Sequence, residues 1–240
     1  MHQLCRHTVI RAVVTIAAVL LLPVGNATAT NIVWDFSGSA GEINSNGTPG
    51  TLTVNGVPGG QPITATGWDV NVAGSSWVAK PLYQRNLAPN DQGLGVCGVS
   101  GCLTGTTQEI DNTGSMRDVI RLDLSAVTGG VNQSLLASVD DSSSSEFYIY
   151  GSNSINPTLS TSTPGVFLVA HGGSSCGVNC QVALTGPYTY LYFTTPAVVN
   201  DGQSYLLHTV STPQVPEPAS LLLLSSGLVG LAAWRRKKKV

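Results

Sequence analysis

The stretch VIRLDL, residues 119–124, decides the fold, because apolar and charged side chains alternate along it with a period of two. In an extended chain this alternation places the two kinds of side chain on opposite faces. The same period recurs in residues 147–150 and 190–193, where Phe, Ile and Leu alternate with Tyr. In residues 68–72, Trp and Val alternate with Asp69 and Asn71. These segments predict half-buried β-strands.

Further segments have the same strand character, and turn pairs such as Asn55-Gly56 and Asp201-Gly202 separate the candidates. These segments are residues 33–36, 76–80, 134–139, 166–170 and 204–210. Short strands at this spacing predict an all-β domain, an antiparallel β-sandwich of jelly-roll type, over residues 30–212. The glycine- and proline-rich residues 38–62 are expected to form a long surface excursion.

The N-terminal end has the three parts of a secretory signal peptide. These are cations at Arg6 and Arg11, an apolar stretch at residues 13–22, and the small-x-small site Ala27-Thr28-Ala29. A buried N-terminal helix is the alternative, but no amphipathic stripe marks a core-facing side. We therefore expect residues 1–29 to be a signal peptide, the protein to be exported, and the mature chain to begin near Thr30.

The C-terminal end combines a short apolar run with a block of cations. The run, residues 219–234, has 16 residues and as a helix would reach about 24 Å, whereas a membrane span needs about 20 residues. The cations that follow are expected to stay on the cytoplasmic side and stop transfer: Arg235, Arg236, Lys237, Lys238 and Lys239. The run is therefore expected to be a hydrophobic helix that inserts only transiently in the inner membrane. A GPI signal, which normally lacks such a cationic block, and a plain C-terminal anchor are the alternatives.

Pro216, Glu217 and Pro218 precede that run, so residues 213–240 contain a Pro-Glu-Pro triplet, an apolar segment and a basic tail in that order. This arrangement resembles the PEP-CTERM sorting signal of bacterial surface proteins. The resemblance implies that an exosortase, an integral-membrane cysteine protease, recognises the triplet at the surface of a bacterium that makes exopolysaccharide. The two prolines favour an extended segment that does not start the helix early. Such a segment would lie accessible just outside the bilayer.

A second stretch, residues 90–125, is similar to a segment that recurs in some exosortase-dependent surface proteins. The matching pieces are Gly93-Leu94-Gly95-Val96, a following cysteine loop, Glu109-Ile110-Asp111-Asn112 and residues 119–124. This similarity supports the same family and implies no catalytic chemistry.

The mature part is acidic, although the whole chain has a formal net charge of only −2. Between residues 30 and 212 the cations are Lys80, Arg85, Arg117 and Arg121, against twelve carboxylates, which leaves a charge of about −8. Nucleic-acid binding is disfavoured because no basic stripe is present. A composition poor in charged residues and rich in Ser, Thr, Asn and Gly suits an extracellular β-domain.

Four cysteines stay in the mature chain after Cys5 leaves with the signal peptide: Cys97, Cys102, Cys176 and Cys180. An even number of clustered cysteines in an oxidising compartment predicts disulfides. Of the three pairings we favour the two local ones, Cys97–Cys102 and Cys176–Cys180, each of which closes a glycine-containing turn. A four-thiolate zinc site is the alternative, but its usual two-residue spacings do not match and export disfavours free thiols.

Residues 173–177 formally match the G-x-S-x-G motif of hydrolases, and His171 lies just before it. A nucleophile elbow needs a strand, a sharp turn and a helix, whereas residues 178–184 have the pattern of a strand. A glycine- and serine-rich hairpin loop is the better interpretation. His171 and His208 are the histidines of the mature part, and either is expected to be an ordinary strand-end residue. No catalytic residue is predicted.

Two kinds of binding residue are candidates. Acidic residues at turns are potential ligands for Ca²⁺, which takes six to eight oxygens, although Asp also favours turns for local reasons. The best calcium candidates are Asp111, Asp140 and Asp141. Exposed tyrosines could present an aromatic platform to sugar rings, but we favour cross-strand packing on a sheet face. These tyrosines are Tyr148, Tyr150, Tyr188, Tyr190 and Tyr192.

We interpret the chain as a non-enzymatic surface or extracellular-matrix protein. It is expected to be exported, held briefly in the inner membrane and processed by an exosortase, with a role in biofilm or exopolysaccharide. The first alternative is a carbohydrate-binding module that uses the tyrosines or a calcium-dependent loop. The second is a secreted hydrolase.

Overall fold

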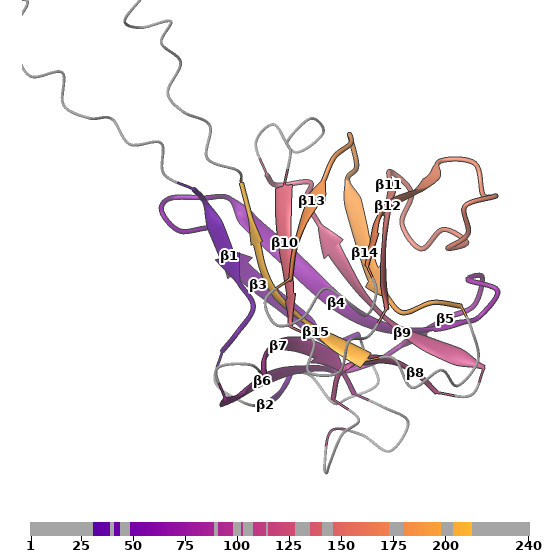
Figure 1. Cartoon of the computed structure of the whole chain (residues 1–240), viewed down its shortest axis with the longest axis horizontal. Coiled ribbons are helices and arrows are strands. Elements are labelled where there is room, and N and C mark those ends of the chain that lie inside the picture. Colours follow the sequence, from indigo (N-terminus) through magenta and orange to yellow (C-terminus); the bar gives the residue numbers. More distant parts are fainter. Residues whose placement is uncertain are drawn as a thin grey trace, which may run out of the picture. The chain divides into compact units, whose positions relative to one another are not determined.

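The computed structural model describes most of the chain between residues 31 and 212, and all regular structure in this part is β-strand (Figure 1). The described residues are 31–38, 41–43, 49–88, 91–97, 102, 108–113, 115–127, 135–140, 146–172, 180–197 and 204–212. The strands are β1 (Val33–Asp35), β2 (Gly41–Ile43), β3 (Thr51–Asn55), β4 (Pro62–Asn71), β5 (Trp77–Ala79), β6 (Leu82–Ala88), β7 (Asp91–Val96), β8 (Ile110–Thr113), β9 (Met116–Asp123), β10 (Leu135–Asp140), β11 (Phe147–Ser152), β12 (Val166–Gly172), β13 (Cys180–Leu184), β14 (Tyr190–Thr194) and β15 (Ser204–Ser211).

The strands pair antiparallel and join into one sheet, which confirms the prediction of an all-β antiparallel domain. The main path runs β12-β11-β14-β9-β8-β15-β7-β6-β2. Beside it, β4 pairs with β9, β3 and β5, while β10 pairs with β15 and β13. The sheet has two halves, one built around β9 (with β3, β4, β5, β11, β12 and β14) and one built around β15 (with β1, β2, β6, β7, β10 and β13). Strand β8 connects them, because Asn112 lies opposite Arg117 of β9 and Ile110 lies opposite Tyr205 of β15.

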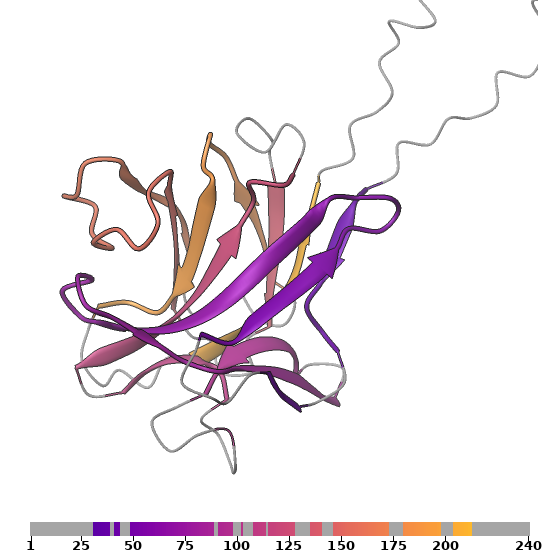
Figure 2. The ribbon, with the colours of Figure 1, turned by 180° about the vertical axis from the view of Figure 1, so that it is seen from behind.

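Both halves of the sheet contribute side chains to one large core, so the arrangement is sandwich-like (Figures 1 and 2). The apolar members of the 119–124 pattern, Ile120, Leu122 and Leu124, are buried in this core as predicted. Phe147, Ile149, Leu191 and Phe193 join them from β11 and β14. The other half contributes Leu94, Val139, Leu207 and Val210. The period-two pattern thus identifies the core residues of β9, β11 and β14.

Strand β4 differs from the sequence expectation, because both of its faces are covered. Ile63 and Ala65 belong to the large core, which places Asp69 on the core-facing side as well. Val70 belongs to a second apolar cluster on the opposite face of the sheet, with Trp68 packed against it. Alternation shows that two faces differ in composition. It does not show which one lies against solvent.

The expectation of a long surface excursion over residues 38–62 is wrong in its second half. Residues Thr51–Asn55 form β3, which pairs with β4 from Thr51 opposite Thr66 to Asn55 opposite Pro62. Gly41–Ile43 form β2 against β6. Gly50 packs closely, since a Cβ there would lie 2.2 Å from the backbone nitrogen of Leu82. Glycine in this segment therefore permits tight packing and does not mark a loop.

The two ends of the described domain lie side by side. Strand β1 pairs with the end of β15, where Val33 is opposite Ser211. The amide of Thr212 donates to the carbonyl of Ile32, and the amide of Ile32 donates to the Thr212 hydroxyl. Figure 1 shows these strands adjacent, in indigo and yellow. The predicted signal peptide and the predicted hydrophobic helix of the tail lie outside the described residues. In the part that is described, no helix has the length and hydrophobicity to cross a membrane.

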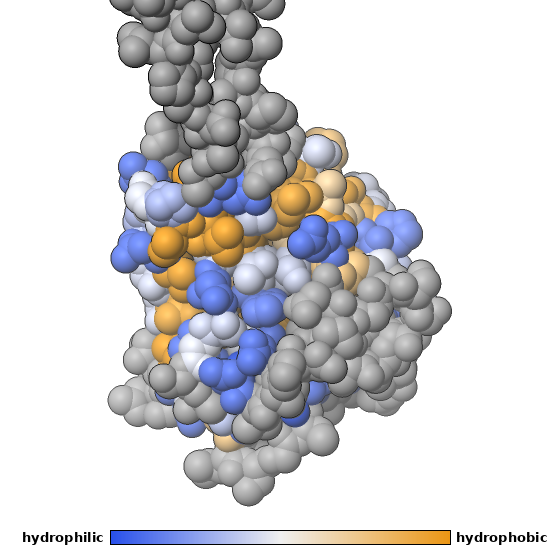
Figure 3. Space-filling view, turned by 60° about the vertical axis from the view of Figure 1, so that its left-hand side comes forward, coloured by the Kyte–Doolittle hydropathy of each residue, from blue (hydrophilic) through white to orange (hydrophobic). Residues whose placement is uncertain are grey.

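Hydrophobic and hydrophilic residues are mixed on the side of the domain that carries β1 (Figure 3). A band of hydrophobic residues crosses this face, with hydrophilic residues around it. The large apolar side chains of high exposure in the described part belong to four different strands or loops: Val57, Val78, Ile155 and Phe167. Apolar residues that stand singly on a surface are ordinary and indicate no function.

Candidate functional site

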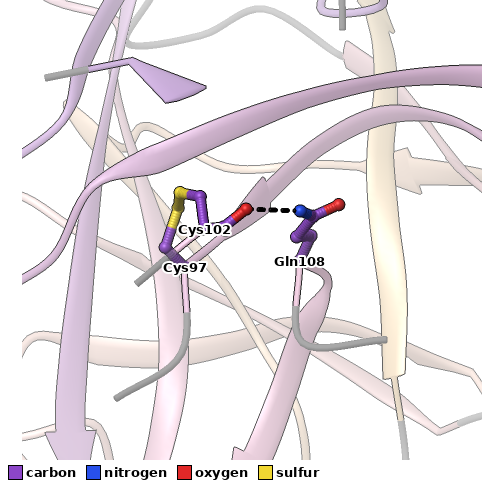
Figure 4. The surroundings of a disulfide bond; sticks show 3 residues. All are labelled: Cys97, Cys102 and Gln108. Atoms are coloured by element: carbon purple, nitrogen blue, oxygen red, sulfur yellow. Dashed lines mark hydrogen bonds between the residues drawn. A yellow bond between two sulfur atoms is a disulfide. The ribbon is translucent and has the colours of Figure 1, made fainter. Parts of the chain in front are cut away.

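The disulfide between Cys97 and Cys102 is present, as the sequence predicts (Figure 4). It closes a short turn after β7, and the two Cα atoms are 4.9 Å apart, within the usual range for a disulfide. Both cysteines are buried. The side-chain amide of Gln108 donates to the carbonyl of Cys102 at 2.8 Å, which ties the cysteine turn to the chain that leads into β8.

Cys180, at the start of β13, is also disulfide-bonded. Its partner lies outside the described residues, so the pairing with Cys176 stays a prediction. The described part holds no group of three or more His, Cys, Asp or Glu residues placed to bind a metal ion.

An ion pair lies beside the cysteine turn. The Arg85 guanidinium of β6 donates to the Glu109 carboxylate at 2.5 Å, and both side chains are mostly buried. Glu109 precedes β8, and its carbonyl accepts from the amide of Val96. The segment at residues 90–125 therefore contains three strands, β7, β8 and β9, together with the disulfide, and the ion pair joins it to β6.

Two carboxyl groups meet on the core-facing side of the sheet. Asp69 of β4 lies directly opposite Asp118 of β9, and both are buried. Lys80 forms an ion pair with Asp69 at 2.9 Å. The amide of Asp111 donates to Asp118 at 3.3 Å. The sequence gives no signal for this pair, because the two residues are the polar members of two strands that are far apart along the chain.

Burial raises the pKa of Asp118 well above its ordinary value, and the hydrogen bond that its protonated form donates to Asp69 and the negative charge of Asp111 act in the same direction. One proton shared between Asp69 and Asp118 relieves the repulsion of two adjacent carboxylates. Lys80 compensates the charge that is left. This arrangement can hold a proton, but it lies on the core-facing side of the sheet, which suits a structural role.

The calcium candidates lie on two strands that flank β15. Asp111 of β8 is opposite Ser204, and Asp140 of β10 is opposite Leu206. Asp141 lies outside the described residues. The structure thus brings Asp111 and the backbone of Asp140 to neighbouring positions along β15, and calcium binding stays a prediction.

The residues of the hydrolase alternative are only partly described. His171 is exposed near the end of β12 and its ring contacts Tyr148, with 6.0 Å between the ring centroids. His208 lies on β15, in the other half of the sheet. Residues 173–177 lie outside the described part. The two histidines therefore belong to different halves of the sheet.

An aromatic layer covers the outer face of the half of the sheet that contains β9. We use this name for Trp68, Trp77, Tyr148, Tyr150, Tyr190 and Tyr192, which pack around Val70, Val119, Leu159 and Val166. Trp77 contacts Trp68 and Tyr192 edge to face, at centroid distances of 5.9 and 5.7 Å. Tyr148 contacts Tyr150, and Tyr190 contacts Tyr192.

The favoured prediction of cross-strand packing is therefore confirmed, whereas the alternative of a fully exposed tyrosine platform does not fit. Tyr150 and Tyr192 are buried, while Tyr148 and Tyr190 are half-buried. Burial raises the pKa of Tyr192, although the Arg121 charge opposes the shift. Tyr188 lies apart from this layer and packs against the large core and Phe167.

Two arginines of β9, Arg117 and Arg121, lie within the aromatic layer. Arg117 is 1% exposed, and its guanidinium lies over the ring of Tyr150 at 6.0 Å. Arg121 is 9% exposed and lies between the rings of Trp68 and Tyr190, at 5.1 and 5.8 Å. Burial lowers the pKa of both arginines, but an arginine stays charged at neutral pH. The sequence identifies both residues as cations but carries no signal for their burial.

The segment between β11 and β12, residues 153–165, contacts this layer through hydrogen bonds. The Arg117 guanidinium donates to the carbonyl of Leu159 at 2.8 Å, and Arg121 donates to the Asn156 side-chain oxygen at 2.5 Å. The Tyr192 hydroxyl donates to the carbonyl of Ser154 at 2.6 Å. Each acceptor is a neutral oxygen. The segment therefore satisfies part of the arginines' hydrogen-bonding capacity without neutralising their charge.

Comparison with known proteins identifies the C-terminal end. Residues 214–237 match the family model of the PEP-CTERM protein-sorting motif. No curated protein and no solved structure matched the chain. Such a motif implies recognition by an exosortase and export to the cell surface with processing at the membrane. The match begins two residues after Thr212, where the described domain ends. The chain thus carries a PEP-CTERM protein-sorting motif, as its Pro-Glu-Pro triplet, apolar run and basic tail predict.

Proposed function

We propose that this protein is a non-enzymatic surface or matrix protein whose tail is a processing signal for an exosortase. The match of residues 214–237 to the sorting motif carries the proposal. In this proposal the signal peptide, residues 1–29, directs export. The apolar run then holds the protein briefly in the inner membrane, and cleavage near Pro216-Glu217-Pro218 separates the folded domain from residues 219–240.

The position of the domain end supports this route. Thr212 is hydrogen-bonded to Ile32, so the ordered chain reaches almost to the motif. From Thr212 to Pro216 the chain spans at most about 14 Å. An exosortase must therefore reach the triplet close to the end of the domain where β1 and β15 pair.

The role of the mature domain in the proposal is association with exopolysaccharide or biofilm outside the cell. Its acidic charge, its disulfide between Cys97 and Cys102 and its all-β architecture suit that environment. The same proposal includes a jelly-roll order of strands, an optional calcium ion bound near Asp111 and no other cofactor.

The decisive experiment is mass spectrometry of the C-terminus of the surface form, in a host that has an exosortase. We expect wild-type protein to lack residues 219–240. Glu217→Ala should leave an unprocessed, membrane-retained precursor. The matched control is Glu42→Ala, on exposed strand β2, which should be processed normally. An intact tail on wild-type surface protein would show that the tail is a plain anchor.

The hydrolase alternative has a separate test. The purified protein should turn over no substrate in a panel of esterase and glycosidase substrates. Turnover that Ser175→Ala abolishes would instead assign the G-x-S-x-G motif a catalytic role.

The carbohydrate-binding alternative is favoured by a specific observation, the arginines of the aromatic layer.

A further inference from the structure

The residues around Arg121 leave part of the aromatic layer exposed, although Arg121 itself is only 9% exposed. Its neighbours Trp68 and Tyr190 are half-buried and come from the adjacent strands β4 and β14. Thr66, directly opposite Arg121 on β4, is also half-buried and accepts the indole N–H of Trp68 at 3.0 Å. Arg117 lies deeper, beneath Leu159. We call Arg121, Trp68, Tyr190 and Thr66 the arginine rim.

Positive charge at this place has no matching negative partner. The ion pairs Lys80–Asp69 and Arg85–Glu109 involve other cations, and within the described residues no ion pair includes Arg117 or Arg121. Asp123 lies two residues further along β9 and favours the charge of Arg121, but it does not pair with it. Buried charges are normally paired. Arg117 and Arg121 lie on the same face of β9, with Cα atoms about 13 Å apart in an extended strand, so this face carries positive charge in an otherwise acidic domain.

Unused hydrogen-bond donors accompany this charge. Four buried nitrogen atoms in the aromatic layer have no hydrogen-bond partner in the described part: Nε and Nη1 of Arg117, Nε of Arg121 and the indole nitrogen of Trp77. A buried donor without an acceptor costs free energy, more so when it is charged. Segment 153–165 supplies one neutral oxygen to each guanidinium, so these donors stay without an acceptor in the described part.

We propose that the arginine rim binds the carboxylate of an acidic sugar, a uronate unit of an extracellular polysaccharide. A planar guanidinium is suited to bidentate recognition of a carboxylate. The half-buried rings of Trp68 and Tyr190 offer apolar surface to the sugar ring beside it. Thr66 and Asn156 add hydroxyl and amide groups of the kind that bind sugar hydroxyls. The site thus combines the charge, the rings and the polar groups that a uronate requires.

Arg121 is the contact residue, and Arg117 acts behind it. Arg121 lies at the rim, whereas Arg117 is held under Leu159, so its charge adds to the local potential without touching the ligand. The rest of the mature domain is acidic, at about −8, and repels a polyanion. Binding should therefore be confined to this rim. The inference extends the proposed association with exopolysaccharide, and it is independent of how the tail is processed.

The experiment is isothermal titration calorimetry of the purified full-length protein with a uronic-acid oligosaccharide, at 0.15 M salt to screen long-range repulsion. A neutral glucose oligosaccharide of equal length is the comparison. We expect binding of the uronate alone. Arg121→Gln should weaken it by about tenfold or more, the effect of losing a hydrogen bond to a charged group. Gln181→Glu, an exposed change on β13 with the same effect on net charge, should bind like wild type.

Two further variants keep the test decisive if Arg121→Gln does not fold. Arg121→Lys retains the charge without the planar fork and should bind the uronate more weakly than wild type. Tyr190→Leu removes a ring and keeps both guanidiniums, and it should also weaken binding. Circular dichroism and the melting temperature establish that each variant is folded.

Three results would overturn the proposal. The first is equal binding of the neutral oligosaccharide, or no binding of the uronate by wild type. The second is wild-type affinity in a folded Arg121→Gln protein. The third is complete displacement of the uronate by an equal concentration of inorganic sulfate, which would identify a general anion site. Each of these outcomes leaves the processing of Glu217 and the proposed export route unaffected, so the two proposals fail separately.

Discussion

Asp118 is the residue whose chemistry the fold changes most clearly. It lies on the core-facing side of β9, opposite Asp69, and its backbone carbonyl accepts the Thr194 hydroxyl at 2.8 Å. Burial raises its pKa well above the ordinary value, with Asp69 and Asp111 contributing. A protonated Asp118 can donate to Asp69, which in turn pairs with Lys80. The stability of the domain should therefore depend on the pH through this residue.

We expect wild-type protein to lose stability relative to Asp118→Asn as the pH rises. In the unfolded chain an aspartate has a pKa of about 3.9, and the folded pKa of Asp118 is higher. Between the two pKa values the folded state binds more protons, so the free energy of unfolding falls with increasing pH. The melting temperature of Asp118→Asn minus that of wild type should grow from about pH 4 towards neutral pH.

Glu42→Gln is the control for this pH series. Glu42 is exposed on β2, and the substitution changes the net charge by the same amount. Its melting temperature should follow that of wild type at each pH. A constant difference between Asp118→Asn and wild type across the pH range would contradict the raised pKa of Asp118.

At the scale of elements, the position of segment 153–165 depends on a glycine turn as well as on the contacts with Arg117 and Arg121. Gly74, in the turn between β4 and β5, has a positive φ of 75°, and its carbonyl accepts from the amide of Leu159 at 3.0 Å. A Cβ at this position would lie 2.7 Å from the backbone nitrogen of Leu159. The close approach of two backbones therefore fixes Leu159 over Arg117.

Gly74→Ala should displace segment 153–165. The substitution places a side chain in a left-handed conformation, which costs about 1 kcal/mol, and adds an overpacking cost of about 1–3 kcal/mol against Leu159. Gly165→Ala is the matched control, because Gly165 has a φ of 77° and open space around its Cβ position. Urea denaturation should show the larger loss in Gly74→Ala, and limited proteolysis should cut residues 153–165 faster only in that variant. Equal losses in the two proteins would mean that the contact with Leu159 contributes nothing.

The cysteine turn after β7 is a second element with a measurable contribution. Cys97 and Cys102 enclose a short loop, and a disulfide across such a loop stabilises by about 2 kcal/mol in the chain-entropy account. Cys97→Ser with Cys102→Ser should lower the free energy of unfolding by about that amount. Non-reducing peptide mapping of the exported protein should join Cys97 to Cys102 and Cys180 to Cys176. A peptide that links Cys97 to Cys180 would contradict the local pairing.

At the scale of the whole molecule, the domain ends where its first and last strands pair. Strand β15 has β1 and β10 as neighbours at this end, and Phe36 donates to the carbonyl of His208. Residues 209–211 pair with both neighbours. The last strand is thus a central one, and the residues that precede the sorting motif belong to the fold.

A protein that ends after Thr212 should therefore fold, and one that ends after Leu207 should not. The first retains every pairing of β15, whereas the second loses the pairings with β1. After export to an oxidising compartment, the longer protein should be soluble, monomeric and rich in β-structure by circular dichroism. The shorter one should aggregate or be degraded. A mostly helical spectrum for the longer protein, or a stable fold for the shorter one, would contradict this account of the domain boundary.

Features that depend on neighbours along the chain were determined by the sequence alone. Alternation in residues 119–124, 147–150 and 190–193 identified strands and their core residues, since side-chain direction in a strand follows position. Cys97 and Cys102 are five residues apart, so a turn suffices to join them. The Pro-Glu-Pro triplet with its apolar run and basic tail is a contiguous signal. Each of these features depends only on residues that are close together along the chain, so the sequence is sufficient to predict it.

Only the tertiary structure decided which groups from different strands meet. Trp68 and Val70 were expected to oppose a solvent-facing Asp69, but a second layer covers their face, and Asp69 meets Asp118 on the core side. Arg117 and Arg121 became buried cations because segment 153–165 returns over β9. The register between strands and the packing of a loop over a sheet both depend on residues that are far apart in the sequence. A period of two fits a strand equally well whichever of its faces lies against the core. Burial, and with it pKa and binding chemistry, is therefore set by what packs on each face.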